Sequence, residues 1–171
     1  TNRIVTGLSS GEGLIWAVRD PIYKKEPIKD KGRVTEYQEV LVDAGIADKR
    51  LLVTESEFAN TLKVMAREGN TLSAAVRQAW DTGHLRTLTK NHPAVASKAH
   101  ISIIGHITRD ELRRNLTATE QTNGFGNRFL WLCVQRSKAL PEGGRIQEVD
   151  FSGLLARLQQ VIEFAATVDE M

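Results

Sequence analysis

Hydrophobic and polar residues are arranged along the chain in two different patterns. Residues 51–53 form a continuous apolar run, and residues 101–104 form one that is interrupted only by Ser102. Short runs of this kind are typical of strands that are buried on both faces. Between them, apolar residues recur at helical spacing over residues 58–66 and 72–80, which predicts two amphipathic helices. Strands that alternate with helices in this way favour an α/β fold with a mostly parallel sheet and helices on both faces.

The same patterns extend the prediction to the rest of the chain. The further predicted elements are a short helix at 9–19, strands at 85–89 and 129–134, and a last helix at 152–167. The last helix would turn four apolar side chains inward, those of Leu154, Leu158, Val161 and Ala165. We expect these elements to form a single domain over residues 1–171.

Two pairs of residues have the spacing of a capping box, in which a hydroxyl and a carboxylate bond the free amides at the start of a helix. Ser9 and Glu12 form one such pair, and Thr108 and Glu111 form the other. The second pair predicts a helix directly after the apolar run at 101–104.

Residues 21–36 have little apolar content to bury. They contain Pro21, Pro27 and Gly32 between short runs of charged residues. A segment of this composition gains little from packing to offset the cost of ordering its backbone. We therefore predict a mobile loop here.

The overall composition is that of an ordinary globular protein. Of 171 residues, 41% are hydrophobic and 26% are charged, and the net charge of +2 is too small to indicate nucleic-acid binding by field strength alone. No apolar stretch is long enough for a membrane span and the first residues do not have the pattern of a signal peptide, which favours a cytoplasmic protein. The chain begins without methionine, as expected of a domain excised from a longer polypeptide.

The single cysteine and the three tryptophans lie in apolar patterns. Cys133 falls within the predicted strand at 129–134, and we expect a small buried hydrophobe in a reducing compartment rather than a nucleophile. Trp16, Trp80 and Trp131 are predicted to be core residues. The four histidines match no zinc-binding spacing, which disfavours a structural metal.

Glu55 is the first candidate for chemistry, because it ends the apolar run at 51–53. In a parallel sheet, ligands bind beyond the carboxyl ends of the strands. A carboxylate there can orient a metal-bound water or activate a water for attack on a phosphoryl group. The alternative is a carboxylate that stabilises the start of the next helix through the helix dipole.

Other candidates follow the strand at 101–104. His106 and Thr108 could sense a γ-phosphate from there, although Thr108 is also the natural N-cap of the next helix. Arg19 and Asp20, at the end of the first predicted helix, are weaker candidates.

Arginines supply two further candidate sites. Arg128 could act as an arginine finger in the nucleotide site of a neighbouring subunit, or it could be a surface arginine paired with an acid. Arg109, Arg113 and Arg114 lie together on the predicted helix after Thr108 and could contact nucleic-acid phosphates. A solvated helix face is the alternative for these three.

The phosphate-binding pattern G-x-x-x-x-G-K-[ST] does not occur in the sequence. Without it, no loop cradles the β-phosphate and no lysine reaches the γ-phosphate. We therefore do not expect this chain alone to bind ATP tightly.

Four ordered sequence blocks carry a family resemblance. They are GLSSGEGLI at 7–15, DKRLLVTESEF at 48–58, AHISIIGHIT at 99–108 and NGFGNRF at 123–129. Together they resemble the RecA-like P-loop ATPase and helicase domain of primase-helicase replication proteins from plasmids, phages and mobile elements. In that family the phosphate loop precedes the first block. The resemblance thus implies a RecA-like three-layer core whose amino-terminal part is truncated.

The resemblance also implies roles for single residues. Glu55 matches the acidic end of the Walker B strand and would bind Mg²⁺, His106 and Thr108 match the sensor strand, and Arg128 matches the candidate arginine finger. ATP and Mg²⁺ are the implied cofactors of the complete protein. The implied partners are single-stranded DNA, a primase-polymerase module and further copies in a ring.

Two functions remain open from the sequence. The first is a fragment of a DNA-replication ATPase, a helicase motor that hydrolyses ATP only with an upstream phosphate-binding loop. The second is a non-catalytic module that retains the fold and binds DNA or protein. A truncated core would expose sheet edges and apolar surface, so we also expect dimerisation or aggregation of the fragment.

Overall fold

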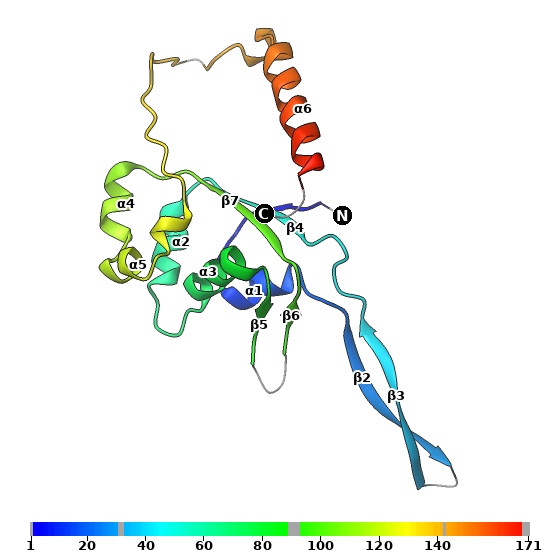
Figure 1. Ribbon diagram of the computed structural model, residues 1–171. Coiled ribbons are helices and arrows are strands. Elements are labelled where there is room, and N and C mark those ends of the chain that lie inside the picture. Colours follow the sequence, from blue (N-terminus) through cyan, green and yellow to red (C-terminus); the bar gives the residue numbers. More distant parts are fainter. Residues whose placement is uncertain (1, 31–32, 89–92, 142, 169–171) are drawn as a thin grey trace. The chain divides into compact units, whose positions relative to one another are not determined.

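Figure 1 shows the computed structural model, which describes residues 2–30, 33–88, 93–141 and 143–168. The chain divides into two compact units, residues 1–133 and 134–171. The structure thus has two units where a single domain was expected over 1–171.

A three-stranded parallel sheet is the centre of the first unit. Its strands are β1 (Ile4–Val5), β4 (Arg50–Glu55) and β7 (His100–Gly105), in the order β1-β4-β7. Leu52 of the middle strand is in register with Ile4 on one side and Ser102 on the other. The first unit is thus α/β with parallel strands, as predicted.

The two faces of this sheet differ. Leu51 and Val53 of β4 point to one face and are buried in the core. Ile4 and Ile104 belong to the other face, where 54% and 52% of these residues are exposed. The prediction of helices on both faces is therefore wrong for the described part of this unit, since this second face remains open to solvent.

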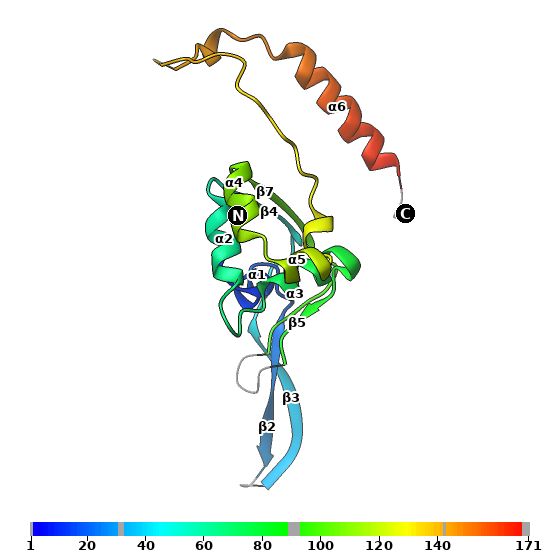
Figure 2. The same ribbon diagram turned by 90° about the vertical axis from the view of Figure 1, so that its left-hand side faces the viewer.

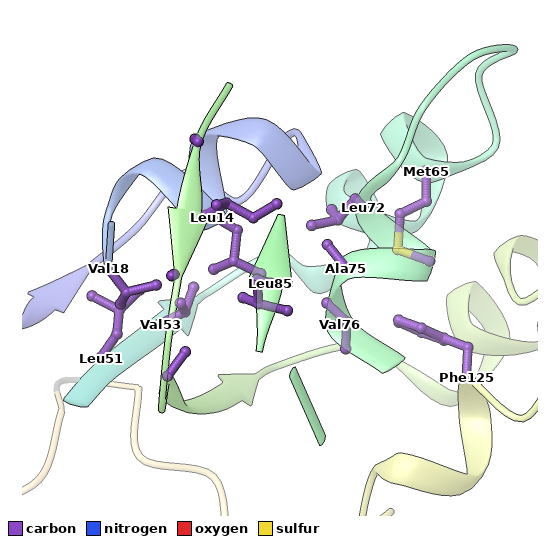
Figure 3. Close-up of a cluster of buried hydrophobic side chains, with 14 of the residues drawn as sticks. Leu14, Val18, Leu51, Val53, Met65, Leu72, Ala75, Val76, Leu85 and Phe125 are labelled. Carbon is purple, nitrogen blue, oxygen red and sulfur yellow. The ribbon is translucent and has the colours of Figure 1, made fainter. Parts of the chain in front are cut away.

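The core lies between the sheet and two helices, α1 (Gly11–Trp16) and α3 (Leu72–Thr82), which pack against each other. Figure 3 shows the cluster of buried side chains that fills this space. Its labelled members are Leu14, Val18, Leu51, Val53, Met65, Leu72, Ala75, Val76, Leu85 and Phe125. Burial of so many apolar side chains provides most of the driving force for folding of this unit.

Helices that follow the strands begin close to the predicted positions. The two amphipathic helices are α2 (Phe58–Met65) and α3, and the helix after β7 is α4 (Arg109–Asn115). Thr108 caps α4 in a complete capping box with Glu111, as predicted. A further short helix, α5 (Ala118–Thr122), follows.

The capping box predicted at Ser9 and Glu12 is wrong by one residue. Ser10 is the N-cap of α1, and its hydroxyl accepts a hydrogen bond from the Gly13 amide. Glu12 instead accepts a hydrogen bond from the Thr71 hydroxyl. Helix α1 is shorter than predicted and ends at Trp16.

A long hairpin occupies the segment predicted as a loop. Strands β2 (Ile22–Asp30) and β3 (Arg33–Asp43) pair in antiparallel fashion and form a separate two-stranded sheet, seen as a ribbon in Figure 2. The prediction of a loop over 21–36 is therefore wrong for the described residues, which exclude 31 and 32. The strands bury little side-chain area, because cross-strand pairing rather than a core holds them.

The strand predicted at 129–134 is also wrong. These residues follow a single 3₁₀ turn, η1 (Gly126–Arg128), in an irregular conformation, and Cys133 is exposed rather than buried. Of the strand predicted at 85–89, residues 85–88 are described and contain β5 (Leu85–Arg86), which pairs with β6 (Val95–Ala96); residue 89 lies outside the described residues.

The three tryptophans do not lie in the core as predicted. Trp80 is 71% exposed, and Trp16 and Trp131 are also exposed. The spacing of apolar residues in the sequence does not show which of them other parts of the chain cover.

The second unit contains the turn η2 (Ile146–Glu148) and the helix α6 (Ser152–Thr167). The helix has the predicted bounds, but the four side chains expected to point inward are exposed. Across the described helices of both units, none combines the length and apolar character needed to cross a bilayer.

Candidate functional site

The carboxyl ends of the parallel strands meet at one edge of the sheet, and Glu55 lies at the centre of this edge. It is the last residue of β4, the middle strand, and is half-buried. Its Oε1 accepts a hydrogen bond of 2.7 Å from the backbone amide of Leu8. The loop that follows β1 is thereby fastened to the end of β4.

Gly7 shapes that loop. Its φ of +86° lies in the left-handed region, which glycine adopts without the steric cost that other residues meet. The turn directs the Leu8 amide toward Glu55 and places Ser10 at the start of α1. Sequence reasoning missed this contact, and the signal was the glycine directly before Leu8.

The helix-start alternative for Glu55 does not describe its position. Helix α2 begins at Phe58, and Glu57 occupies the N-cap position without a side-chain capping bond. Glu57 instead accepts a hydrogen bond from Asn60. The Glu55 carboxylate bonds a loop from another strand, so its role is not that of a carboxylate in the first turn of α2.

His106 lies beside Glu55 at the same edge. Its amide donates a hydrogen bond of 2.8 Å to the Glu55 carbonyl, and its own carbonyl accepts one of 2.9 Å from the Phe58 amide. These two bonds join the ends of β4 and β7 to the start of α2. The His106 residue is exposed, so its imidazole is accessible at this edge.

Gly105 lets α2 approach the sheet closely. It is in register with Glu55, and a Cβ built on it would lie 2.7 Å from Cγ of Phe58. A side chain at this position would therefore displace the Phe58 ring. The close contact fixes the turn that carries both Glu55 and His106.

Thr108 has the capping role that the sequence left open. Its hydroxyl accepts a hydrogen bond from the Glu111 amide and donates one of 2.9 Å to the Glu111 carboxylate. The hydrogen bond from the Thr108 side chain is the largest cause of the lowered pKa of Glu111. The Thr108 hydroxyl is therefore committed to the helix start in this structure.

Arg128 forms an ion pair within its own chain. Its guanidinium donates to both carboxylate oxygens of Asp81 at 2.7 and 2.8 Å and to the Gly124 carbonyl at 2.7 Å. Its side chain is 20% exposed. The pairing with an acid that the sequence left open is thus present, with Asp81 as the partner that sequence reasoning did not identify.

Aromatic rings hold the segment that carries Arg128. Phe129 stacks at a tilt against Phe58, Phe125 and Trp131, with ring centroids 4.9 to 5.5 Å apart. Phe125 is fully buried in the core. These contacts connect the segment to α2 and leave Arg128 little freedom to move.

The three arginines predicted to contact nucleic acid are exposed on or at the start of α4. Arg109 and Arg113 are four residues apart and share a helix face, and Arg114 lies next to them. Because α4 follows the end of β7, this basic face belongs to the same end of the sheet as Glu55 and His106.

Arg19 and Asp20 lie at the opposite end of the strands. Asp20 accepts hydrogen bonds from Lys49 at 2.6 Å and from the Ser97 amide at 2.9 Å, and Lys49 directly precedes β4. Arg19 forms a two-point ion pair with Asp43, the last residue of β3. The position of Arg19 and Asp20 therefore does not support the prediction that they take part in ligand chemistry.

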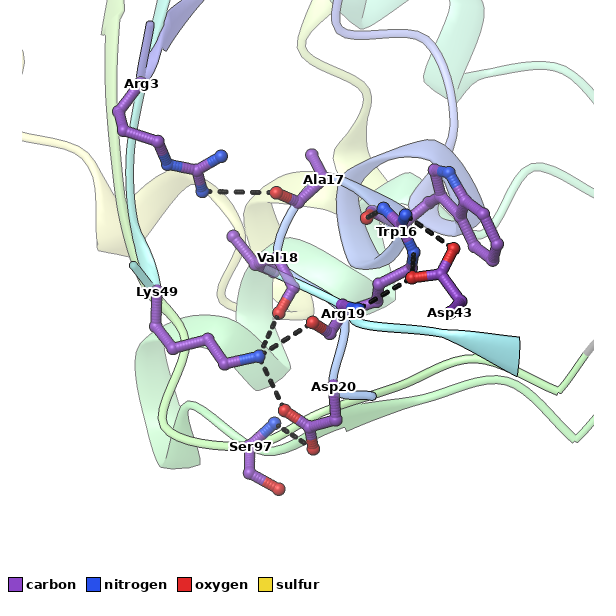
Figure 4. A network of polar contacts seen from close by, with 10 residues as sticks. Arg3, Trp16, Ala17, Val18, Arg19, Asp20, Asp43, Lys49 and Ser97 are labelled. Carbon is purple, nitrogen blue, oxygen red and sulfur yellow. Dashed lines mark hydrogen bonds and ion pairs between the residues drawn. The ribbon is translucent and has the colours of Figure 1, made fainter. Parts of the chain in front are cut away.

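Figure 4 shows this second network, which fastens the base of the hairpin. Lys49 also donates to the carbonyls of Val18 and Arg19. The Arg19 guanidinium lies 4.0 Å from the centre of the Trp16 ring, a cation–π contact. The network is structural, and it explains why Trp16 lies at the surface.

Within the described residues, no group of three or more His, Cys, Asp and Glu side chains is placed to hold a metal ion. No family model, curated protein or solved structure matches this chain. The family resemblance therefore stays a prediction.

Proposed function

We propose that this chain is part of a nucleotide-hydrolysing motor that acts in DNA replication, with its phosphate-binding loop supplied by polypeptide outside this sequence. The observation that carries the proposal is the position of Glu55 at the carboxyl end of the middle strand of a parallel sheet. This is the edge where α/β folds bind their ligands. The sequence blocks around it are the ones that resemble RecA-like helicase domains.

The carboxylate of Glu55 fits the proposed chemistry. It is held by the Leu8 amide, so its orientation is fixed before any substrate arrives. In this role Glu55 accepts a proton from, or orients, the water that attacks the terminal phosphoryl group.

A bound Mg²⁺ fits the residues present, because this ion commonly uses only one or two protein carboxylates and takes other ligands from phosphates and water. Glu55 would hold it together with the nucleotide. When bound, Mg²⁺ supplies positive charge that stabilises the phosphoryl group during transfer.

The exposed arginines suit a DNA track. Arg109, Arg113 and Arg114 form a basic face at the same end of the sheet as Glu55. Arginines on one helix face contact phosphates without regard to sequence, as a motor that moves along single-stranded DNA requires. His106 is exposed between Glu55 and this face and is the proposed sensor residue.

Two engaged side chains favour the second function, a non-catalytic module that binds DNA or protein. Thr108 is bonded to Glu111, and Arg128 is bonded to Asp81. A finger that acts on a neighbouring subunit would first have to leave Asp81. If Arg128 remains paired with Asp81, its match to the family pattern reflects a role in folding rather than in catalysis.

The decisive experiment compares ATP hydrolysis by this chain and by a longer protein that includes an upstream phosphate-binding loop, each with single-stranded DNA. Glu55→Gln keeps the size and hydrogen-bonding oxygen of the side chain but removes its charge. Glu57→Gln is the matched control, since Glu57 is exposed two residues away. We expect activity only in the longer protein, lost with Glu55→Gln and retained with Glu57→Gln. No activity in either protein would favour the binding module.

A further inference from the structure

The two outer edges of the hairpin are not equivalent. Strand β2 contains Pro27, which lacks an N–H and is tolerated in a strand where its nitrogen faces away from the neighbouring strand. It also carries three lysines, Lys24, Lys25 and Lys29. Prolines and lysines protect an edge from pairing with further strands. Strand β3 has 11 residues and contains neither a proline nor a lysine.

Strand β3 also exposes its apolar side chains. Tyr37 is 66% exposed, and Val34, Leu41 and Val42 are exposed as well. An isolated two-stranded ribbon is only marginally stable in water, whereas further strands supply backbone bonds and side-chain partners. A long edge that exposes apolar side chains and contains neither proline nor lysine is therefore a site where another strand is expected to add.

The charge of the hairpin indicates which partner fits. The described residues of the two strands carry four basic side chains, Lys24, Lys25, Lys29 and Arg33. They carry five acidic ones, Glu26, Asp30, Glu36, Glu39 and Asp43. A ribbon without an excess of positive charge is a poor match for a nucleic acid or an anionic membrane, because both bind surfaces that carry such an excess.

We propose that β3 pairs in antiparallel fashion with β3 of a second copy of this chain, about a two-fold axis at Gln38. Gln38 is the middle residue of the strand. The pairing joins two hairpins into one four-stranded sheet with the strand order β2-β3-β3-β2. A two-fold axis uses the same edge on both copies, as closed dimers require.

The sequence of β3 is complementary to itself in this register. Glu36 lies opposite the partner's Val40, and Tyr37 opposite the partner's Glu39. Val34 lies opposite the partner's Val42. No two carboxylates are placed directly opposite each other, although the strand contains Glu36 and Glu39, and two apolar pairs form across the interface at residues 34 and 42. This complementarity, not the proposed ATPase function, carries the inference.

The first test measures the association of the chain by sedimentation velocity across micromolar concentrations. Val40→Glu places like charges opposite the partner's Glu36 twice per dimer. Within its own hairpin, residue 40 lies opposite Lys24, so the new carboxylate does not disturb the ribbon. We expect a dimer that Val40→Glu weakens at least about fivefold. Adding Glu36→Lys to this variant makes the pair attractive and should restore the dimer.

The second test uses a cysteine at the axis, in a chain whose native Cys133 is replaced by serine. Gln38→Cys brings two thiols within about 5 Å, close enough for a disulfide under oxidised glutathione. Glu26→Cys is the control, because residue 26 lies opposite Gln38 on β2 and is about 14 Å from its counterpart in the four-stranded sheet. We expect a covalent dimer only with Gln38→Cys.

Three outcomes would overturn the proposal. The first is a monomer at all concentrations, and the second is a dimer that Val40→Glu leaves unchanged. The third is equal crosslinking of both cysteine variants. These results are independent of ATP hydrolysis, so they separate the dimer proposal from the proposed function.

Discussion

The backbone amide of Leu8 donates a 2.7 Å hydrogen bond to Glu55 Oε1, which connects the loop after β1 to the end of β4. The two residues are 47 positions apart in the sequence. The same carboxylate is therefore a structural acceptor and the proposed catalytic group. These two roles can be separated by substitution.

Glu55→Ala should destabilise the chain, whereas Glu55→Gln should not. Alanine leaves the partly buried Leu8 amide without its acceptor, at a cost of about 1–2 kcal/mol in the free energy of unfolding. Glutamine keeps an oxygen at this position. Urea unfolding of both variants measures the difference, with Glu68→Ala at an exposed position as control. Equal stability of Glu55→Ala and the native chain would show that the hydrogen bond contributes little.

Gly105→Ala should also be destabilising. Its Cβ would lie 2.7 Å from the Phe58 ring, and overpacking of this kind costs about 1–3 kcal/mol. Thermal unfolding gives the effect. Gly153→Ala is the control, because no atom lies within 4 Å of a Cβ at that helical position and alanine should be tolerated there. If both substitutions are neutral, the close packing of α2 on β7 is not rigid.

The pair of Arg128 and Asp81 should show a measurable coupling energy. The side chains are 20% and 49% exposed, so solvent screens the pair in part, and we expect a coupling of about 1 kcal/mol. A double-mutant cycle with Arg128→Ala and Asp81→Ala measures it. The exposed pair of Arg145 and Glu148 provides a reference where coupling should be near zero. Coupling no larger than the reference would mean that Arg128 is free to act elsewhere.

Acid should weaken the network at the base of the hairpin. Burial raises the pKa of Asp20, but hydrogen bonds from Lys49 and Ser97 outweigh it, so the net pKa is lowered. The hydrogen bond from Arg19 is the main cause of the lowered pKa of Asp43. A lowered pKa in the folded state stabilises the protein above the unfolded value of about 4. This stability is lost as the pH falls through the folded pKa.

Asp20→Asn tests this linkage. The variant should be less stable than the native chain at neutral pH, and its stability should fall less between about pH 4 and the acid limit. Unfolding by urea at a series of pH values gives both curves. Glu68→Gln, an exposed site, should follow the native curve. Parallel curves for Asp20→Asn and the native chain would contradict the assignment.

The sequence predicted those elements whose signals are local. The run of apolar side chains in the sequence predicts the buried strand β4. The capping box at Thr108 and Glu111 predicts the start of α4. Glu55 could be assigned to the end of a strand for the same reason. Its partner Leu8 was not identified, because Gly7 indicates a turn in the sequence but does not show which acceptor the following amide reaches.

The errors arise where structure depends on distant residues. The hairpin has the composition of a loop, and only the pairing of β2 with β3 makes it regular. The apolar run at 129–134 has the composition of a strand, yet Phe129 packs on aromatic rings from other segments and the residues after it extend into solvent. Helix α6 begins and ends as predicted, but helical spacing identifies an apolar face without showing what covers it.

The base of the hairpin brings the outgoing and returning chain to almost the same point. A Cβ built on Gly45 would lie 2.5 Å from the carbonyl carbon of Asp20, and the Ile46 amide bonds the Arg19 carbonyl. Residues 21–44 therefore leave the first unit and return to it at the same point. The distance between Asp20 and Gly45 does not depend on how long the hairpin is. A change in the length of the ribbon therefore leaves the parallel sheet, and the edge that carries Glu55, in the same position.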